Sequence, residues 1–139
     1  MQTFLPYPEF TKSAEVLDYR RLGKQRVEAW QLLNILISGK TVGGWVNHPA
    51  TRMWRGSELS LALYGRTICE EWIRRGYNDS LLDRFNKILG NAPVLIPPVW
   101  LGNSEFHRSH QSNLVRKDSV FYGPKFPGVP SNLPYIWPI

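Results

Sequence analysis

Residues 17–30, LDYRRLGKQRVEAW, place several cations around one acid. On a helix, one face of this segment would carry Arg21, Lys24, Gln25 and Glu28, flanked by Arg20 and Arg26. Arginine suits bidentate contacts with phosphate, and nearby positive charge keeps a carboxylate ionised. Such a face is typical of a site that grips a polyanion beside a group able to take a proton or stabilise an oxocarbenium ion. The alternative is a solvated charged surface with Glu28 in an ordinary salt bridge.

A second group of polar side chains surrounds the predicted start of another helix, in NHPATRMWRG, residues 47–56. Helix N-termini attract anions, and His48 lies one helical turn from Arg52. Trp54 could stack on bases or fill the gap left by a displaced base, and Arg55 adds a further cation. In the alternative reading, His48 is a partly buried hydrogen-bonding group and Trp54 belongs to the core.

Two histidines lie three residues apart in EFHRSHQSNLVRK, residues 105–117. His107 and His110 would share a helical face suited to phosphate contact, proton transfer or structural hydrogen bonds. With His48 they could form a three-histidine metal site, but no carboxylate–histidine signature accompanies them. We therefore expect neither a metal nor any other cofactor.

The composition describes one basic domain, predicted to span residues 1–139. The chain has a formal net charge of +6 and 42% hydrophobic residues, and a basic balance favours nucleic acid as a partner. No apolar run is long enough to span a membrane, and the N-terminus does not have the pattern of a secretory signal. The lone Cys69 fits a reducing compartment, where it would be a small buried side chain. We expect a cytoplasmic location, in a bacterial cell or a phage-infected host.

The absence of several catalytic motifs excludes some classes of enzyme. The sequence contains no G-x-S-x-G, CxxC pair or HExxH motif, so serine hydrolase and zinc protease chemistries have no support.

Hydrophobic periodicity predicts an all-α fold, a compact helical bundle of about four to five helices. The expected helices cover about 13–37, a short turn after Asn47, 57–75, 80–89 and 104–117. Residues 1–12 are expected to be irregular, and residues 119–139, rich in proline and aromatic residues, to wrap the helices as an ordered coil. Gly23 interrupts the first helix at a cost of about 1 kcal/mol, unless close packing requires it.

Two stretches resemble the pyrimidine-dimer DNA glycosylase family, known from phage as endonuclease V. DYRRLGKQRV is similar to the family's first-helix segment, with a Tyr-Arg pair, a leucine and a further arginine. HPATRMWRGSELSLALYGRTICEEWIRRGYN is similar to its second-helix region, with a proline-led entry and a long helix that ends in a basic pair, a glycine and an aromatic residue. LDYRRLGKQRVEA with NHPATRMW is closer still to a bacterial and phage branch grouped with this family. The likeness covers most of residues 13–80, and the C-terminal third matches loosely.

This resemblance implies an all-α domain that binds duplex DNA and expels a base from the stack. In that family the α-amine of the N-terminal residue attacks the deoxyribose C1′. The attack breaks the glycosidic bond, and the resulting Schiff base allows β-elimination of the strand. An α-amine titrates near about 7.7–8.0, so a useful fraction is a neutral nucleophile at pH 7. A carboxylate on the first helix assists, and arginines hold the phosphates; Arg20 and Arg26 match family arginines.

Two positions depart from the family pattern. The family's catalytic glutamate directly follows the Tyr-Arg pair, where this chain has Arg21. Glu28, two turns further on the same face, could substitute for it, and Asp18 is a second candidate. The family's nucleophile is a small residue exposed by loss of the initiator methionine. In this chain residue 2 is Gln2, a bulky side chain that usually leaves the initiator methionine in place. Met1 would then carry the free amine.

We therefore expect a DNA glycosylase-like enzyme, with or without AP-lyase strand cleavage, that acts as a monomer on a damaged or modified pyrimidine in double-stranded DNA. The predicted catalytic residues are Met1, Gln2, Glu28 and Arg21. The predicted DNA-binding residues are Arg20, Arg21, Lys24, Gln25, Arg26, His48, Arg52, Trp54, Arg55, His107 and His110. Two alternatives remain: a non-catalytic DNA-binding module, and an enzyme that binds a nucleotide or modified base in a histidine–arginine phosphate pocket. No membrane or protein partner is expected.

Overall fold

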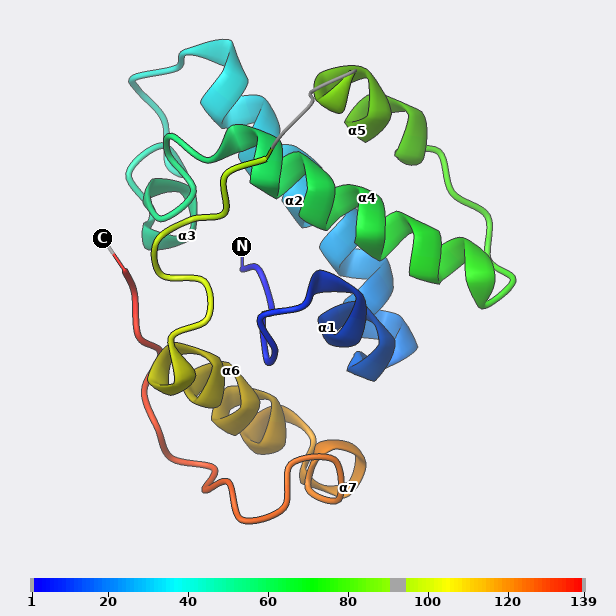
Figure 1. Ribbon diagram of the computed structural model, residues 1–139, viewed down its shortest axis with the longest axis vertical. Helices are drawn as coiled ribbons and strands as arrows, with labels where there is room; N and C mark the ends of the chain where they lie inside the picture. The colour runs from blue at the N-terminus through cyan, green and yellow to red at the C-terminus, as the bar shows by residue number, and fades with distance from the viewer. Residues whose placement is uncertain (1, 91–94, 139) are drawn as a thin grey trace.

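Helices make up all the regular structure in residues 2–90 and 95–138, the part of the chain that this computed structural model describes (Figure 1). They are α1 (Phe10–Val16), α2 (Tyr19–Ser38), α3 (Pro49–Arg52), α4 (Glu58–Arg74), α5 (Leu82–Leu89), α6 (Ser104–Lys117) and α7 (Ser119–Tyr122). The all-α prediction is confirmed. There are more helices than the predicted four to five, because one long helix is divided and a short one forms near the C-terminus.

The division falls at Leu17 and Asp18, inside the helix predicted from Ser13 to about Ile37. Both residues have extended backbone, with ψ of 139° and 159°. The Asp18 carboxylate accepts a hydrogen bond from the Arg21 backbone nitrogen and so starts α2. The predicted single helix is therefore wrong: Asp18 is the N-cap of a second helix, and Ser13, where the helix was predicted to begin, is a buried residue within α1.

Helix α4 packs against both α2 and α5, and a glycine allows close approach at each contact. A Cβ atom on Gly23 of α2 would lie 2.9 Å from the Trp72 ring of α4. A Cβ atom on Gly65 of α4 would lie 2.2 Å from the Phe85 ring of α5. The close approach considered for Gly23 is therefore present, and it offsets the helix-propensity cost of glycine.

Segments near both ends of the chain, at Leu5 and Leu133, contact α6. Thr3, Phe4 and Leu5 are buried, although they belong to no helix. The C-terminal segment after α7 runs back along α6 as an ordered coil (Figure 1), where Leu133 hydrogen-bonds to the side chains of Ser112 and Asn113. The prediction of a wrapping C-terminal coil is confirmed apart from α7 at its start.

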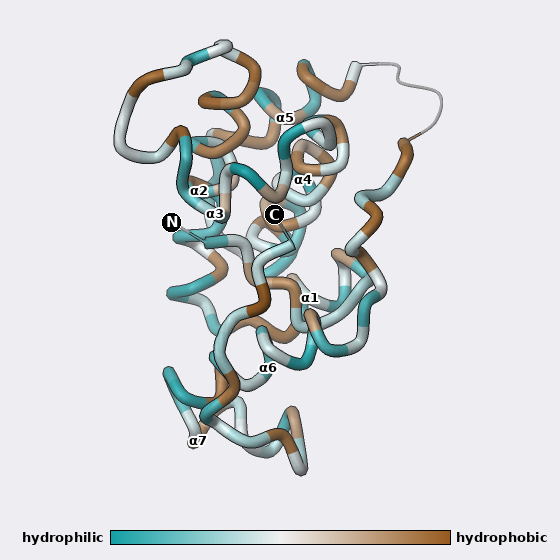
Figure 2. The backbone as a smooth tube through the Cα atoms, turned by 90° about the vertical axis from the view of Figure 1, so that its left-hand side faces the viewer, coloured by the Kyte–Doolittle hydropathy of each residue, from teal (hydrophilic) through white to brown (hydrophobic). Residues whose placement is uncertain are grey.

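One connection extends away from the packed helices. Residues 39–48 form a wide loop beyond the end of α2, at the upper left of Figure 2. Gly39 ends α2 with a φ of +70°, in the left-handed region that glycine adopts without strain. In residues 2–90 and 95–138, no helix is both long enough and apolar enough to cross a membrane.

Candidate functional site

The beginning of the described chain lies against the acidic residue singled out in α2. The backbone nitrogen of Gln2 donates a hydrogen bond of 2.7 Å to Oε2 of Glu28. Glu28 is only 9% exposed, and Lys24 Nζ lies 3.6 Å from its other carboxylate oxygen. Met1 itself lies outside the described residues. Glu28 is therefore an almost buried carboxylate with a backbone nitrogen on one oxygen and an ammonium group near the other.

Gln25 and Tyr64 hold the next residues of the N-terminal segment. The Gln25 side chain accepts from the Phe4 backbone nitrogen at 3.0 Å and donates to the Gln2 carbonyl oxygen at 2.6 Å. The Tyr64 hydroxyl lies 2.9 Å from the Phe4 carbonyl oxygen. Gln25 is 1% exposed and Tyr64 is fully buried. Gln25, predicted to contact DNA, instead pairs with the backbone of the N-terminal segment as a neighbouring strand would.

His107 and His110 of α6 hold both polar groups of the Leu5 backbone. The Leu5 nitrogen donates to Nδ1 of His110 at 3.0 Å, and the Leu5 oxygen lies 2.7 Å from Nδ1 of His107. Nε2 of His107 accepts from the Gly102 nitrogen. These contacts require a proton on Nδ1 of His107 and none on Nδ1 of His110, so both rings are neutral.

Burial favours the same protonation state. It lowers the pKa of His110 to about 3, and His107 nearby adds to the effect. Burial also lowers the pKa of His107. Because both rings lie in the interior and contact the backbone, the structure does not support the prediction that they contact DNA.

Trp54 is likewise an interior residue. Its side chain is 0% exposed, its Nε1 donates to Oγ1 of Thr3 at 3.1 Å, and its ring packs edge-on against Trp100. It cannot fill a gap in DNA without leaving the core, so the predicted wedge role does not agree with its position. We define the N-terminal clamp as the buried side chains that bind residues 2–5: Gln25, Trp54, Tyr64, His107 and His110.

A hollow of about 930 Å³ opens beside Glu28. We call it the cationic pocket; basic residues outnumber acidic ones in its lining, five to three. The basic residues are Arg20, Arg21, Lys24, Arg75 and Lys117, and the acidic ones are Asp18, Glu28 and Asp118. Gln2, Phe4, Tyr19, Gln25 and Phe121 complete the lining. Of the predicted group in α2, all but Arg26 reach this pocket.

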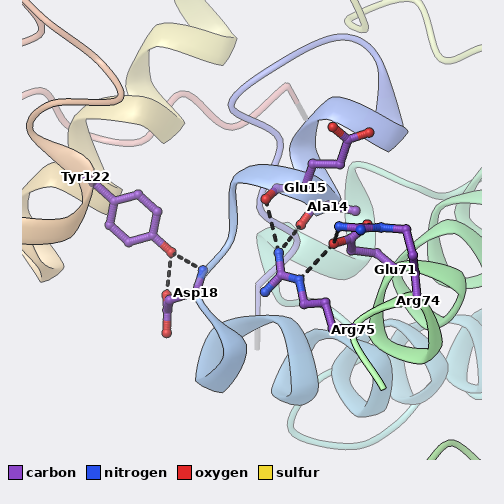
Figure 3. Close-up of polar contacts among 7 residues, drawn as sticks. All are labelled: Ala14, Glu15, Asp18, Glu71, Arg74, Arg75 and Tyr122. Carbon is purple, nitrogen blue, oxygen red and sulfur yellow. Dashed lines mark hydrogen bonds and ion pairs between the residues drawn. The ribbon is translucent and has the colours of Figure 1, made fainter. Parts of the chain in front are cut away.

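Asp18 connects α2 with α7 at the edge of the cationic pocket. Its backbone nitrogen donates to the Tyr122 hydroxyl at 2.9 Å, and that hydroxyl donates in turn to the Asp18 carboxylate (Figure 3). Arg21 Nη1 lies 3.1 Å from the same carboxylate. Burial alone would raise the pKa of Asp18, but the hydrogen bonds from Tyr122 and Arg21 outweigh it and the pKa is lowered. Asp18 is therefore an ionised structural residue.

Arg75 was not predicted to belong to the site, and most of its hydrogen-bonding capacity is used within the fold. Its Nε donates to Glu71 Oε2 at 2.7 Å, and its Nη2 donates to the carbonyl oxygens of Ala14 and Glu15 (Figure 3). It joins the end of α4 to the end of α1 and presents a neutralised cation to the pocket.

Lys117 is the other basic residue that sequence reasoning missed. It is exposed in the last turn of α6 and lines the cationic pocket. Partial desolvation lowers the pKa of Lys117, and the charges of Arg21 and Lys24 add to the effect. A basic residue at a helix C-terminus is common for electrostatic reasons alone, so the sequence carried no signal that Lys117 faces Glu28.

Arg26 is placed elsewhere. Its guanidinium lies 2.5 Å from Asp79, whose side chain is 1% exposed, and it stacks 4.6 Å from the centre of the Trp72 ring. Two partners within the fold occupy this group, so its predicted phosphate contact does not agree with the structure.

The predicted cluster at the second helix does not line the cationic pocket. Nδ1 of His48 accepts from the Ala50 nitrogen at 3.0 Å and so caps α3. Arg55 donates to the Val46 carbonyl oxygen at 3.1 Å, and Arg52 is exposed.

Within residues 2–90 and 95–138, no group of three or more histidine, cysteine, aspartate or glutamate side chains is placed to hold a metal ion. The three-histidine site considered from the sequence is therefore not formed. Cys69 is buried, as expected.

Comparison with known proteins identifies the family of the chain. The sequence model of the family described as pyrimidine dimer DNA glycosylase matches residues 1–84, more than half of the chain. Those residues include Gln2, α2 and Glu28. No curated protein and no solved structure matches the chain. The chain belongs to the pyrimidine dimer DNA glycosylase family.

Proposed function

We propose that this protein is a DNA N-glycosylase that excises a damaged or modified pyrimidine from duplex DNA with its N-terminal amine and Glu28. The observation that carries the proposal is the 2.7 Å contact between the Gln2 nitrogen and the Glu28 carboxylate, beside a pocket with an excess of cations. Family membership supports the reaction class.

The reaction needs a neutral amine and an ionised carboxylate. The amine lone pair forms a bond to the deoxyribose C1′ while the glycosidic bond breaks, and the base leaves with the electron pair and takes up a proton. Glu28 stabilises the positive charge that develops on the sugar and accepts the proton that the amine loses. The C1′–O4′ bond of this aminal then breaks, with a proton taken up by O4′, to give a Schiff base. The Schiff base is hydrolysed or undergoes β-elimination, and the elimination would give AP-lyase activity.

Either N-terminal residue can supply the amine. If Met1 is removed, the Gln2 nitrogen is the nucleophile, and it already lies 2.7 Å from Glu28. If Met1 is retained, that nitrogen is an amide, and the Met1 amine is one residue away. In both cases the clamp holds residues 2–5, with the Gln2 nitrogen at Glu28.

The exposed cations of the pocket would hold the DNA backbone. Arg20, Lys24 and Lys117 are exposed, and Arg21 is partly exposed beside Asp18. Phosphates attract such a cluster over about one Debye length, 8–10 Å at physiological salt, so the sugar of a bound strand would lie near Glu28.

Replacing Glu28 with Gln tests the proposal, because glutamine keeps the acceptor oxygen for the Gln2 nitrogen and removes the charge. We expect base release from lesion-bearing duplexes to fall by about 100-fold or more, with DNA affinity retained. Glu70→Gln is the matched control, since Glu70 is exposed on α4 outside the cationic pocket. Unchanged turnover in Glu28→Gln would contradict the proposal. Salt-dependent binding without base release by the unaltered chain would favour a non-catalytic DNA-binding module.

A further inference from the structure

Glu28 lies at the boundary between two hollows. The first is the cationic pocket. The second, about 570 Å³ in volume, lies further along α2 and shares only Lys24 and Glu28 with the first. We call it the amide pocket; the rest of its lining is Val27, Gln31, Asn34, Ile35 and Trp45. A strand bound with its sugar at Glu28 would therefore meet different chemistry on either side.

Apart from the shared Lys24 and Glu28, the lining of the amide pocket is uncharged. Its α2 residues recur at helical spacing and so form one stripe on that helix. Val27 is 43% exposed, and the amides of Gln31 and Asn34 are exposed as well. An amide both donates and accepts hydrogen bonds. The pocket thus combines apolar contact area with two amides and, apart from the shared Lys24, lacks the cations of its neighbour.

Trp45 is a further lining residue of the amide pocket. It belongs to residues 39–48, the loop beyond the end of α2 (Figure 2). It is 43% exposed, which is unusual for the largest apolar side chain. Its carbonyl oxygen accepts from Oγ1 of Thr51 at 2.6 Å, and its ring lies 4.8 Å from the His48 ring. Because His48 caps α3, these contacts attach an exposed aromatic ring to a helix next to the amide pocket.

We propose that the amide pocket receives the nucleobase to be excised, with Trp45 against its ring face and Gln31 and Asn34 along its polar edge. This inference rests on the proposed glycosylase function. The bond to be broken joins sugar and base, so phosphates and base must lie on different sides of the catalytic carboxylate. Apart from Lys24, which lines both pockets, the cations lie in the pocket on one side of Glu28, and the pocket on the other side holds uncharged amide and aromatic side chains. Amides read the donor and acceptor pattern of a base edge, and indole stacks on any base.

In this arrangement the amide pocket determines which base the protein excises. A base whose polar edge matches the two amides would be held, whereas one that leaves them unpaired would lose affinity by the cost of a buried unsatisfied group. Trp45 would contribute to the extraction of every base, because stacking does not depend on sequence.

The test compares Gln31→Ala, Asn34→Ala and Trp45→Ala with Asn86→Ala, an exposed asparagine of α5 that lines neither pocket. Each variant is assayed for kcat/KM of base release from duplexes carrying one uracil, thymine glycol, 5-hydroxymethyluracil or cyclobutane thymine dimer. Its affinity for a duplex with a tetrahydrofuran abasic analogue is measured in parallel. The ratio of the two quantities isolates contacts with the base from contacts with the backbone.

We expect the three pocket variants to lower this ratio by about tenfold or more, and Gln31→Ala and Asn34→Ala to change the order of preferred bases. Asn86→Ala should keep the unaltered ratio. If all three pocket variants also keep it, the pocket assignment is overturned. If the unaltered chain releases no base from any duplex, the proposed function falls. In that case, the affinity for a duplex with a mismatched pyrimidine is compared with the affinity for the tetrahydrofuran duplex. If the unaltered chain prefers the mismatched duplex and Trp45→Ala loses this preference, the pocket binds a base as assigned. If Trp45→Ala keeps the preference, the assignment is overturned.

Discussion

The backbone nitrogen of Gln2 and the carboxylate of Glu28 meet at 2.7 Å although 26 positions separate them in the chain. The contact exists because the N-terminal clamp fixes residues 2–5 through their backbone groups. Side chains on α2, α4 and α6 all take part, so the start of the chain is held from several helices. The geometry of the candidate active site is thus a property of the whole fold.

Removing one clamp residue should therefore affect stability and turnover together. In His110→Ala the Leu5 nitrogen loses its acceptor in a buried place, which costs about 1–3 kcal/mol of unfolding free energy. Base release should fall by more than the folded fraction explains, because the first nitrogen is no longer held at Glu28. Urea unfolding and single-turnover base release, measured on the same preparation, check this. Loss of stability with unaltered turnover of the folded fraction would show that the clamp does not position the amine.

The buried histidine also predicts a dependence of stability on pH. His110 has a pKa of about 3 in the folded chain against 6.5 for an exposed histidine, because burial disfavours its charged form. Between these values the unfolded chain binds a proton that the folded chain does not. The unfolding free energy should therefore fall as the pH drops from 6.5 toward 3, by up to about 1.4 kcal/mol per pH unit from this group.

The comparison of wild type with His110→Gln isolates that contribution. Glutamine does not titrate, so urea unfolding at several pH values between 7 and 4 should give a shallower slope for the variant. Identical slopes would mean that His110 titrates normally in the folded protein and that its environment differs from the one described.

Packing between α4 and α5 makes a prediction about Gly65. A Cβ atom there would lie 2.2 Å from the Phe85 ring, which is fully buried and cannot move freely. Gly65→Ala should therefore lower the unfolding free energy by about 1–3 kcal/mol, despite the better helix propensity of alanine. Gly44→Ala is the control, since nothing lies within 4 Å of its added atom. Thermal unfolding that ranks the two in the opposite order would contradict this packing.

Salt titrations can distinguish the cations that face DNA from those used within the fold. Lys117→Ala should reduce the slope of log affinity against log salt by about 0.9 if this residue contacts one phosphate. Arg26→Ala should leave the slope unchanged and lower stability instead, because Arg26 pairs with the buried carboxylate of Asp79. The reverse pattern would show that the cationic pocket is not where DNA binds.

The sequence predicted well those features that depend on local pattern. The helix of residues 104–117 has the observed bounds, and Gly23, for which close packing was considered, lies against Trp72 within an unbroken α2. The cationic face around Glu28 also follows from spacing within one helix. The break at Asp18 was missed because a capping aspartate and a surface aspartate look alike before the chain is folded.

Contacts between distant segments could not be predicted. His107, His110 and Trp54 are polar or amphipathic, and their types fit a DNA surface as well as an interior hydrogen bond. Only the position of the N-terminal segment between α2 and α6 decides for the interior. Lys117 lines the same pocket as Glu28 for a similar reason, because the end of α6 comes near α2 only in the folded chain.

The central claim is that the first amine of the chain reacts at C1′ of the lesion sugar beside Glu28. The most direct test is borohydride reduction during reaction with a lesion-bearing duplex, followed by digestion and mass spectrometry of the cross-linked peptide. We predict one adduct, on the α-amine of the N-terminal peptide, strongly reduced in Glu28→Gln. An adduct on a lysine such as Lys24 or Lys117, or base release without any adduct, would contradict the claim.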